Sequence, residues 1–185
     1  MRARSLTLLL VAITALAVTA CGDKEARTLH GDTEGSYIDV GNLKYQVQIS
    51  RLLNPTDRED QGYLVDLPGG QQLGATDQWF AVFMRVENDS KQPGRAATDY
   101  DIRDTQGNVY RPITMGPKNV FAYRSAVLQP KDILPFASSP AGENTIQGAM
   151  LLFKIPVANF QNRPLVLEIH SPSGGNETGT VDLDV

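Results

Sequence analysis

The sequence predicts an all-β protein, an antiparallel β-sandwich, and three observations support this. Apolar and polar residues alternate in several short segments, glycines and prolines separate these segments, and no comparable stretch keeps the 3.6-residue period of an amphipathic helix. Short strands joined by Gly and Pro turns are typical of a sandwich rather than of an α/β fold. A chain of 185 residues has room for one such domain with a real core.

The first two expected strands differ in their faces. Residues 43–50 alternate, with Leu43, Tyr45, Val47 and Ile49 on one side and polar residues on the other, as in a half-buried strand. Residues 78–87 are apolar on both sides, with Phe80, Val82, Met84 and Val86 on one face and Trp79, Ala81 and Phe83 on the other. A strand with two apolar faces is expected at the centre of a sheet.

The remaining strands follow the same reasoning. Tyr100 and Ile102 start a strand that breaks at residues 104–108 and resumes at residues 109–110, which predicts a hairpin. Residues 149–155 alternate up to Pro156, and residues 165–170 and 181–185 alternate as well. Two connections are long, residues 54–76 and 111–131, and long loops on a rigid sandwich are where binding usually resides.

The N-terminus has the features of an export signal. Arg2 and Arg4 precede an uncharged, mostly apolar stretch, Leu6 to Ala20, which has the length and flanks of a signal peptide and is short for a spanning helix. This stretch ends at the only cysteine of the chain, in the sequence Val18-Thr19-Ala20-Cys21-Gly22. These residues resemble the bacterial lipobox.

The lipobox resemblance implies cleavage before Cys21 and attachment of diacylglycerol to its sulfur, which would anchor the protein in the cell membrane on the extracytoplasmic side. A single thiol per chain builds no internal disulfide framework, which agrees with this role. We therefore expect a signal peptide over residues 1–20, the lipidated Cys21 and a flexible tether over residues 21–36, and the sandwich domain over residues 37–185.

Four pieces of the body occur in an order that resembles the telokin-like, immunoglobulin-fold domains of many bacterial lipoproteins. They are the central strand with its polar end (Phe80 to Ser90), the hairpin residues Asp104, Gly107 and Tyr110, the turn residues Pro140, Gly142 and Glu143, and the strand from Gly148 to Pro156. The resemblance covers residues 37–185, with Ala141 inserted between the usual Pro and Gly. It implies an immunoglobulin-like sandwich and supplies no catalytic residues.

The sequence offers little material for catalysis. The two histidines, His30 and His170, lie in the expected tether and near a strand end, no Gly-x-Ser-x-Gly motif occurs, and a lipidated Cys21 has no free thiol. We expect no enzyme, no cofactor and no metal site, although a carboxylate-dependent hydrolase stays open because the separation of carboxylates is a three-dimensional quantity. Calcium ligands are the remaining metal alternative, as either Asp99, Asp101 and Asp104 or Asp57, Glu59 and Asp60.

The second long connection contains the best candidate for binding. Phe121, Tyr123 and Arg124 fall close together there, and such residues are enriched at binding hot spots. They also suit a strand packed on the edge of the sandwich. Exposure separates the two interpretations, since the binding one requires exposed side chains.

Charge narrows the choice of partners. The net charge of −4, without a run of Lys and Arg, disfavours nucleic acid. The sequence thus predicts a membrane-anchored lipoprotein that acts as a non-enzymatic binding module, with an envelope protein or a cell-wall component as its partner. A structural component in envelope assembly is the alternative function.

Overall fold

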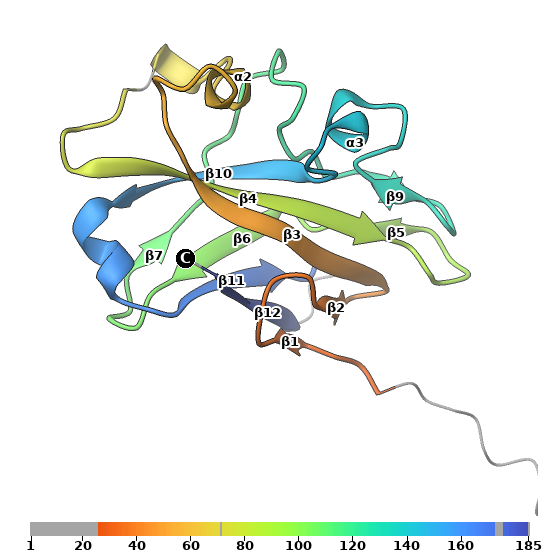
Figure 1. The fold of residues 1–185 in the computed structure, drawn as a ribbon. Helices are drawn as coiled ribbons and strands as arrows, with labels where there is room; N and C mark the ends of the chain where they lie inside the picture. Colours follow the sequence, from red (N-terminus) through yellow and green to blue (C-terminus); the bar gives the residue numbers. More distant parts are fainter. Residues whose placement is uncertain (1–25, 71, 173–175, 185) are drawn as a thin grey trace, which may run out of the picture.

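The computed structural model describes residues 26–70, 72–172 and 176–184, and these residues form a β-sandwich (Figure 1). The predicted all-β fold is confirmed. Cys21 and the expected signal peptide lie outside the described residues. The helices among the described residues have three to five residues each, and none of them has the length and hydropathy of a membrane span.

One main sheet has the strand order β1-β12-β11-β6-β7, and the other has the order β10-β4-β3-β2, with β9 beside the end of β4. Strands β5 and β8 form a third, two-stranded sheet. Pairing is antiparallel except between β1 and β12. The strands are β1 His30–Gly31, β2 Tyr37–Val40, β3 Leu43–Leu53, β4 Asp77–Glu87, β5 Gly94–Arg95, β6 Asp99–Arg103, β7 Val109–Tyr110, β8 Val127–Leu128, β9 Ile133–Leu134, β10 Ala149–Pro156, β11 Leu165–His170 and β12 Thr178–Leu183. The helical turns are α2 Asp60–Tyr63, η1 Pro68–Gly70, α3 Pro140–Glu143 and η2 Val157–Gln161.

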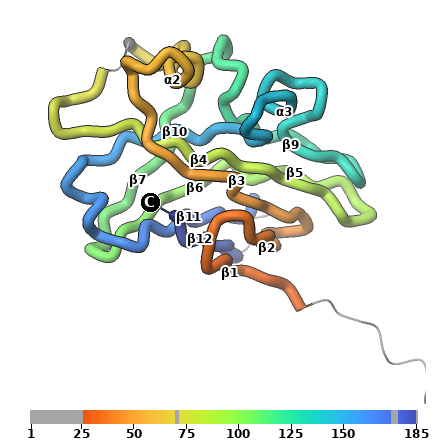
Figure 2. The backbone as a smooth tube through the Cα atoms, in the orientation of Figure 1, coloured from red at the N-terminus to blue at the C-terminus, as the bar shows by residue number. Residues whose placement is uncertain are grey.

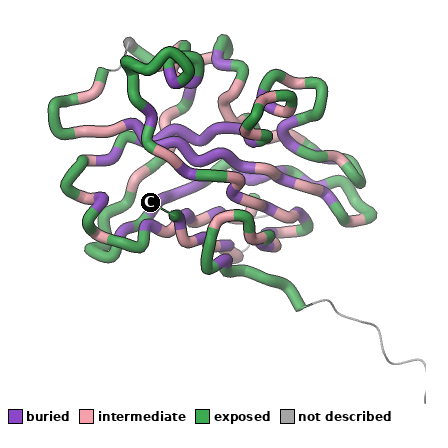
Figure 3. The backbone as a smooth tube through the Cα atoms, in the orientation of Figure 1, coloured by how far each residue is buried: buried purple, intermediate pink, exposed green. Residues whose placement is uncertain are grey.

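Strand β4 is central, as its two apolar faces predicted. It pairs with β3 on one side and β10 on the other, and it is buried along most of its length (Figure 3). Phe80 and Val82 enter the core between the two sheets, whereas Trp79 and Phe83 enter a second cluster on the outer face of their sheet. The domain therefore has an inner core and an outer cluster, which share the strands β3, β4 and β10.

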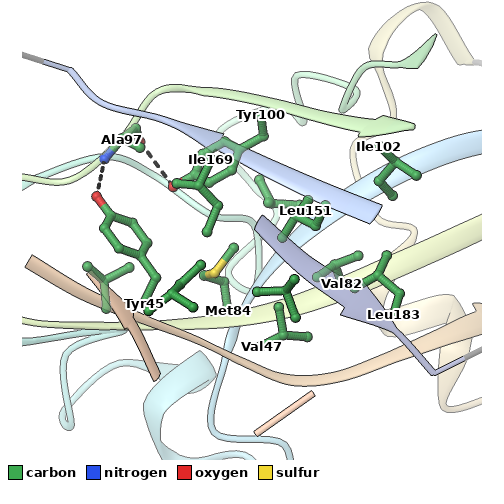
Figure 4. Packing of buried hydrophobic residues seen from close by; sticks show 14 of the residues in the cluster. Tyr45, Val47, Val82, Met84, Ala97, Tyr100, Ile102, Leu151, Ile169 and Leu183 are labelled. Atoms are coloured by element: carbon green, nitrogen blue, oxygen red, sulfur yellow. Dashed lines mark hydrogen bonds between the residues drawn. The ribbon is translucent and has the colours of Figure 1, made fainter. Parts of the chain in front are cut away.

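The inner core is closed at one end by tyrosines around a single backbone unit. The Ala97 amide donates to the Tyr45 hydroxyl at 2.8 Å, and the Tyr100 hydroxyl donates to the Ala97 carbonyl at 3.3 Å (Figure 4). Both side chains are essentially inaccessible to solvent, so their polar ends need such partners. Burial raises the pKa of Tyr45 to about 12.

The two long connections cover the outer cluster. Both lie on the same side of the molecule, beyond the sheet that contains β10 and β4 (Figure 2). Tyr63 of α2 stacks edge-on against Phe83 at 5.0 Å between ring centroids, and Met115 of the second connection is buried in the same cluster. These connections are long because an apolar outer sheet face needs cover from solvent.

One expected side chain lies on the opposite face. The alternation predicts Ile49 on the same face of the strand as Val47. In the structure, the register between β3 and β4 shifts between these two residues. Such a bulge turns the following residues to the other face of the strand, so Ile49 is 37% exposed and Ser50 is buried instead. The Glu34 carboxylate accepts from the Ser50 amide at 2.9 Å and so provides a hydrogen-bond partner for this backbone group next to the bulge.

The prediction of a flexible tether over residues 21–36 is wrong for residues 27–36, which are bound to the sandwich. The Thr180 amide donates to the Leu29 carbonyl, and the guanidinium of Arg27 forms two short bonds, of 2.6 and 2.7 Å, with Glu177. His30 is also held, because its Nδ1 lies 2.8 Å from the Thr180 hydroxyl. The segment is polar because it binds through its backbone and through ion pairs rather than through apolar burial.

Candidate functional site

The segment that contains Phe121, Tyr123 and Arg124 follows the free edge of β10. Met150 of β10 donates its amide to the Phe121 carbonyl and accepts from the Tyr123 amide, both at 2.7 Å, and a parallel bridge joins Ala122 to Met150. A strand edge left open would expose unpaired backbone groups. The backbone of the segment therefore acts as an edge strand, as the second interpretation expected.

Asn119 fixes the start of this segment. Its side-chain amide donates to the carbonyls of Tyr63 and Val65 at 2.8 and 2.9 Å, and its side-chain oxygen accepts from the amides of Phe121 and Ala122, both at 3.0 Å. The residue is 2% exposed. One buried side chain thus joins the two long connections and sets the path of the chain past β10.

The three expected binding residues have different surroundings. Phe121 is half-buried against Tyr63, with ring centroids 4.9 Å apart, and Tyr123 is half-buried against Tyr100, with centroids 5.2 Å apart. The Tyr123 hydroxyl donates to the Ala97 carbonyl at 3.0 Å, and burial raises its pKa well above the ordinary value. Arg124 is exposed and donates to the Gly116 carbonyl at 2.7 Å. The two aromatic rings contribute to packing, and Arg124 is the member of the set that faces solvent.

Cavities lie on both sides of the segment. One, of about 160 Å³, lies toward residues 112–115 and is lined by Tyr100 and Tyr123. The other, of about 380 Å³, lies toward residues 134–141. We call this second cavity the apolar groove; it is lined chiefly by Pro117, Val120, Arg124, Pro135, Phe136 and Pro140.

The apolar groove displays large side chains that nothing in the described structure covers. Val120 is 54% exposed and Phe136 is 43% exposed. Arg124 is the one charged residue among the lining residues, all of which are described, and no carboxylate lines the groove although the protein is acidic overall. An apolar surface beside one cation suits an apolar ligand that carries a negative charge.

The far wall of the groove is a single tight turn. Ser139 caps α3 by accepting from the Gly142 amide at 3.2 Å, and its hydroxyl donates to the Phe136 carbonyl at 2.6 Å. A Cβ at residue 142 would lie 2.3 Å from the Phe136 carbonyl oxygen, so only glycine lets the turn approach this closely. The groove is therefore built into the fold rather than left between loose loops.

Each calcium alternative contains one carboxylate that is already bound within the chain, Asp104 in the first set and Asp60 in the second. Asp104 accepts from the side chains of Asn108 and Asn162 at 2.8 and 2.9 Å. Asp60 is paired with Arg51 and accepts from the Asn54 amide at 2.8 Å. These contacts give both carboxylates structural work in their own loops.

Sequence reasoning identified the segment but missed the groove. Phe136, Pro135 and Pro140 come from a part of the chain that has no alternating pattern, and they meet Val120 only through the fold. The turn Pro140–Glu143 is the part of the groove that the sequence does indicate. It enters the sequence analysis only as part of the family resemblance, with no prediction that it forms one wall of a site.

Comparison with known proteins supports the fold. No protein-family model and no curated protein matches the chain. The yjhA protein of Bacillus subtilis has a similar structure, with 12% identity over 83% of this chain and 99% of that chain and a TM-score of 0.53. So does the protein ycdA of the same organism, described as a candidate lipoprotein, with 10% identity over 86% of this chain and 39% of that chain and a TM-score of 0.50.

An uncharacterised β-sandwich protein of Clostridium difficile gives a lower TM-score of 0.44, with 10% identity over 87% of this chain and 98% of that chain. Identities this low show a shared architecture and nothing about activity. The chain is a β-sandwich protein whose solved structural neighbours include a candidate lipoprotein.

Proposed function

We propose that this protein is an extracytoplasmic lipoprotein, anchored by lipid on Cys21, whose sandwich domain is a non-enzymatic binding module. Support for the anchor comes from the lipobox-like sequence around Cys21, from the telokin-like order of motifs and from a candidate lipoprotein among the structural neighbours. Two acyl chains are enough for stable attachment to a membrane.

The proposed binding surface is the apolar groove, and the main support for it is the exposure of large apolar side chains there. Its volume of about 380 Å³, with Val120 and Phe136 exposed, is enough for one or two large apolar side chains. Arg124 adds a cation at this apolar surface. The partner is therefore a segment of another envelope protein that presents apolar side chains next to a carboxylate.

Photo-crosslinking in cells tests the groove, with the probe at Val120 of the anchored protein. We expect one envelope protein, and the crosslinked peptide should contain apolar residues beside Asp or Glu. Arg124→Glu should reduce the yield by about tenfold, since it replaces attraction by repulsion. Lys118→Glu is the matched control, because Lys118 is exposed nearby but does not line the groove.

Two results would contradict the groove as the binding surface. One is an equal yield with Arg124→Glu and Lys118→Glu, and the other is capture of the same protein from a probe at Val109, which is 42% exposed on β7. A domain with a purely structural role in the envelope predicts the second result.

The anchor has a separate test. Cys21→Ala should move the protein from the membrane fraction to the soluble fraction and abolish incorporation of a labelled fatty acid. Retention in the membrane fraction without label would show that something other than lipid on Cys21 holds the protein there.

A further inference from the structure

The outer face of the other sheet carries a cluster of three potential metal ligands. In β11, Leu167 and Ile169 point into the inner core, so Glu168 and His170 point outward. Asp101 of β6 lies directly opposite Glu168 in the register. The topology thus brings Asp101 of β6 next to Glu168 and His170 of β11, which lie far from it in the sequence.

The distances within this cluster suit a small cation. His170 Nε2 lies 3.2 Å from Asp101 Oδ2 and 3.9 Å from Glu168 Oε2, and the three ligand atoms lie within 4.8 Å of one another. Ligands bound tetrahedrally to zinc at about 2.0–2.1 Å are separated by roughly 3.4 Å. Small shifts of these side chains would bring their ligand atoms to such distances around a metal ion, while the paired backbone of β6 and β11 stays in place.

A buried carboxylate atom provides independent support. The Asp101 side chain is 7% exposed, and its Oδ1 has no hydrogen-bond partner. Arg111 Nε approaches this oxygen at 3.4 Å, from a side chain that is 78% exposed. Buried carboxylate oxygens are normally hydrogen-bonded or bound to a cation. Oδ1 has an ion pair with the exposed Arg111 but no hydrogen bond, whereas Oδ2 faces His170, so a metal ion that binds Asp101 would replace one long ion pair and no hydrogen bond of Oδ1.

The histidine ring is oriented for coordination. Its Nδ1 lies 3.3 Å from the Thr178 hydroxyl of β12, so Nε2 faces the two carboxylates. Such a partner on the second ring nitrogen is the usual way in which proteins fix a metal-binding histidine.

Two arginines occupy the neighbourhood and set the charge. Arg103 Nε lies 2.9 Å from Glu168 Oε1, and Arg111 approaches Asp101. Their side chains are 46% and 78% exposed, so both reach solvent without rebuilding the sheet. They balance the carboxylates without a metal, and Arg111 competes with a metal for Asp101.

We propose that Asp101, Glu168 and His170 form a zinc site, in which one imidazole and two carboxylates bind the ion and water completes a fourth position. This ligand set suits zinc among common divalent ions. Among the described residues, no other group of three His, Cys, Asp or Glu side chains brings its ligand atoms this close together. The site lies on the sheet that does not form the apolar groove, so it stands independently of the proposed binding function.

Calorimetric titration of the full lipidated protein in detergent with zinc chloride tests the site. We expect one zinc per chain, and His170→Gln and Glu168→Gln should each weaken binding by at least about tenfold. Arg111→Gln should tighten binding several-fold, because it removes the competing cation. A merely structural ion-pair network would not respond in this way.

His30→Gln is the matched control, because His30 is the other histidine of the chain. It lies on β1, at the edge of the same sheet, and pairs with Asp32 at 3.0 Å. The affinity of this variant for zinc should equal that of the wild type. The proposal is overturned if the wild type takes up no zinc, or if His30→Gln abolishes uptake while His170→Gln retains it. Circular dichroism on each variant verifies that the loss does not come from unfolding.

Discussion

At the scale of single residues, buried polar side chains hold the loops in place. Asn119 makes four hydrogen bonds to backbone groups of both long connections. Asn119→Ala removes all four and leaves buried carbonyl and amide groups without these partners. We expect the free energy of unfolding to fall by about 2–4 kcal/mol in urea titrations.

The control for Asn119 is Asn176→Ala, a change at an exposed asparagine that should alter stability by less than about 0.5 kcal/mol. Equal stabilities of the two variants would mean that water replaces Asn119 without cost. In that case the path of residues 119–124 would depend on packing alone.

Asp104 makes stability depend on pH. Burial acts to raise its pKa, but hydrogen bonds from Asn108, Asn162 and Tyr110 outweigh burial, so the pKa lies well below its ordinary value. Its carboxylate therefore stabilises the fold above the unfolded pKa of about 3.9, and this contribution is lost as the pH falls toward the folded pKa. Asp104→Asn should cost about 2–3 kcal/mol at neutral pH, and this difference should shrink below about pH 4.

Urea titrations from neutral pH down to about pH 3 measure this dependence. Asp99→Asn is the control, because Asp99 is an exposed carboxylate at the start of β6, the strand that Asp104 directly follows. A constant difference between wild type and Asp104→Asn across this range would show that the carboxylate charge does not matter.

At the scale of elements, β1 is held in its sheet mainly by backbone hydrogen bonds of the residues that precede it rather than by burial of its own side chains. The carbonyls of Thr28 and Leu29 accept from the amides of Asp39 and Thr180, at 2.6 and 2.8 Å. Arg27 braces this arrangement through Glu177, but its side chain is 46% exposed. Arg27→Ala should therefore cost less than about 1 kcal/mol globally while it speeds hydrogen exchange at the Asp39 amide.

Exchange measured by NMR separates these two effects. Arg58→Ala replaces another exposed arginine and should leave the Asp39 amide unchanged. If both variants give the same exchange rate at Asp39, then the backbone bonds hold the segment without help from Arg27.

The sequence predicted strands where side chains alternate and missed elements that depend on distant backbone. β3, β10 and β11 each alternate apolar side chains on one face, and β4 is apolar on both faces, so the local sequence of each strand reports its burial directly. β1 has two residues, and its partner β12 lies about 150 residues away, so no local period reveals it. The bulge after Val47 also escapes pattern reading, because a register shift is set by pairing with β4.

At the scale of the whole molecule, both candidate sites are products of topology. The sequence predicts a binding site at Phe121, Tyr123 and Arg124, which lie close together along the chain. In the fold, however, the rings of Phe121 and Tyr123 pack against the outer cluster and the inner core. Phe136 lines the groove beside Val120, and Asp101 contacts His170, only because the fold brings separate segments of the chain together. Sequence spacing carries no signal for contacts of this kind.

At this scale we also expect the inner core and the outer cluster to unfold as one cooperative unit. Strand β4 sends Phe80 into the inner core and the single tryptophan, Trp79, into the outer cluster, where it is 2% exposed. Trp79 fluorescence and far-UV circular dichroism should therefore report coincident transitions in denaturant. Phe80→Ala should shift both midpoints together, by a loss of about 3–5 kcal/mol, although Phe80 faces away from the tryptophan.

Phe83→Ala provides the converse test, because this change removes a ring from the outer cluster itself. If the loops that cover Trp79 formed a separate unit, Phe83→Ala would move the fluorescence transition to lower denaturant and leave the circular dichroism transition in place. A shared shift follows instead if alternate residues of β4 must be buried on both faces at once, since the strand cannot lose one face to solvent and keep its pairing with β10.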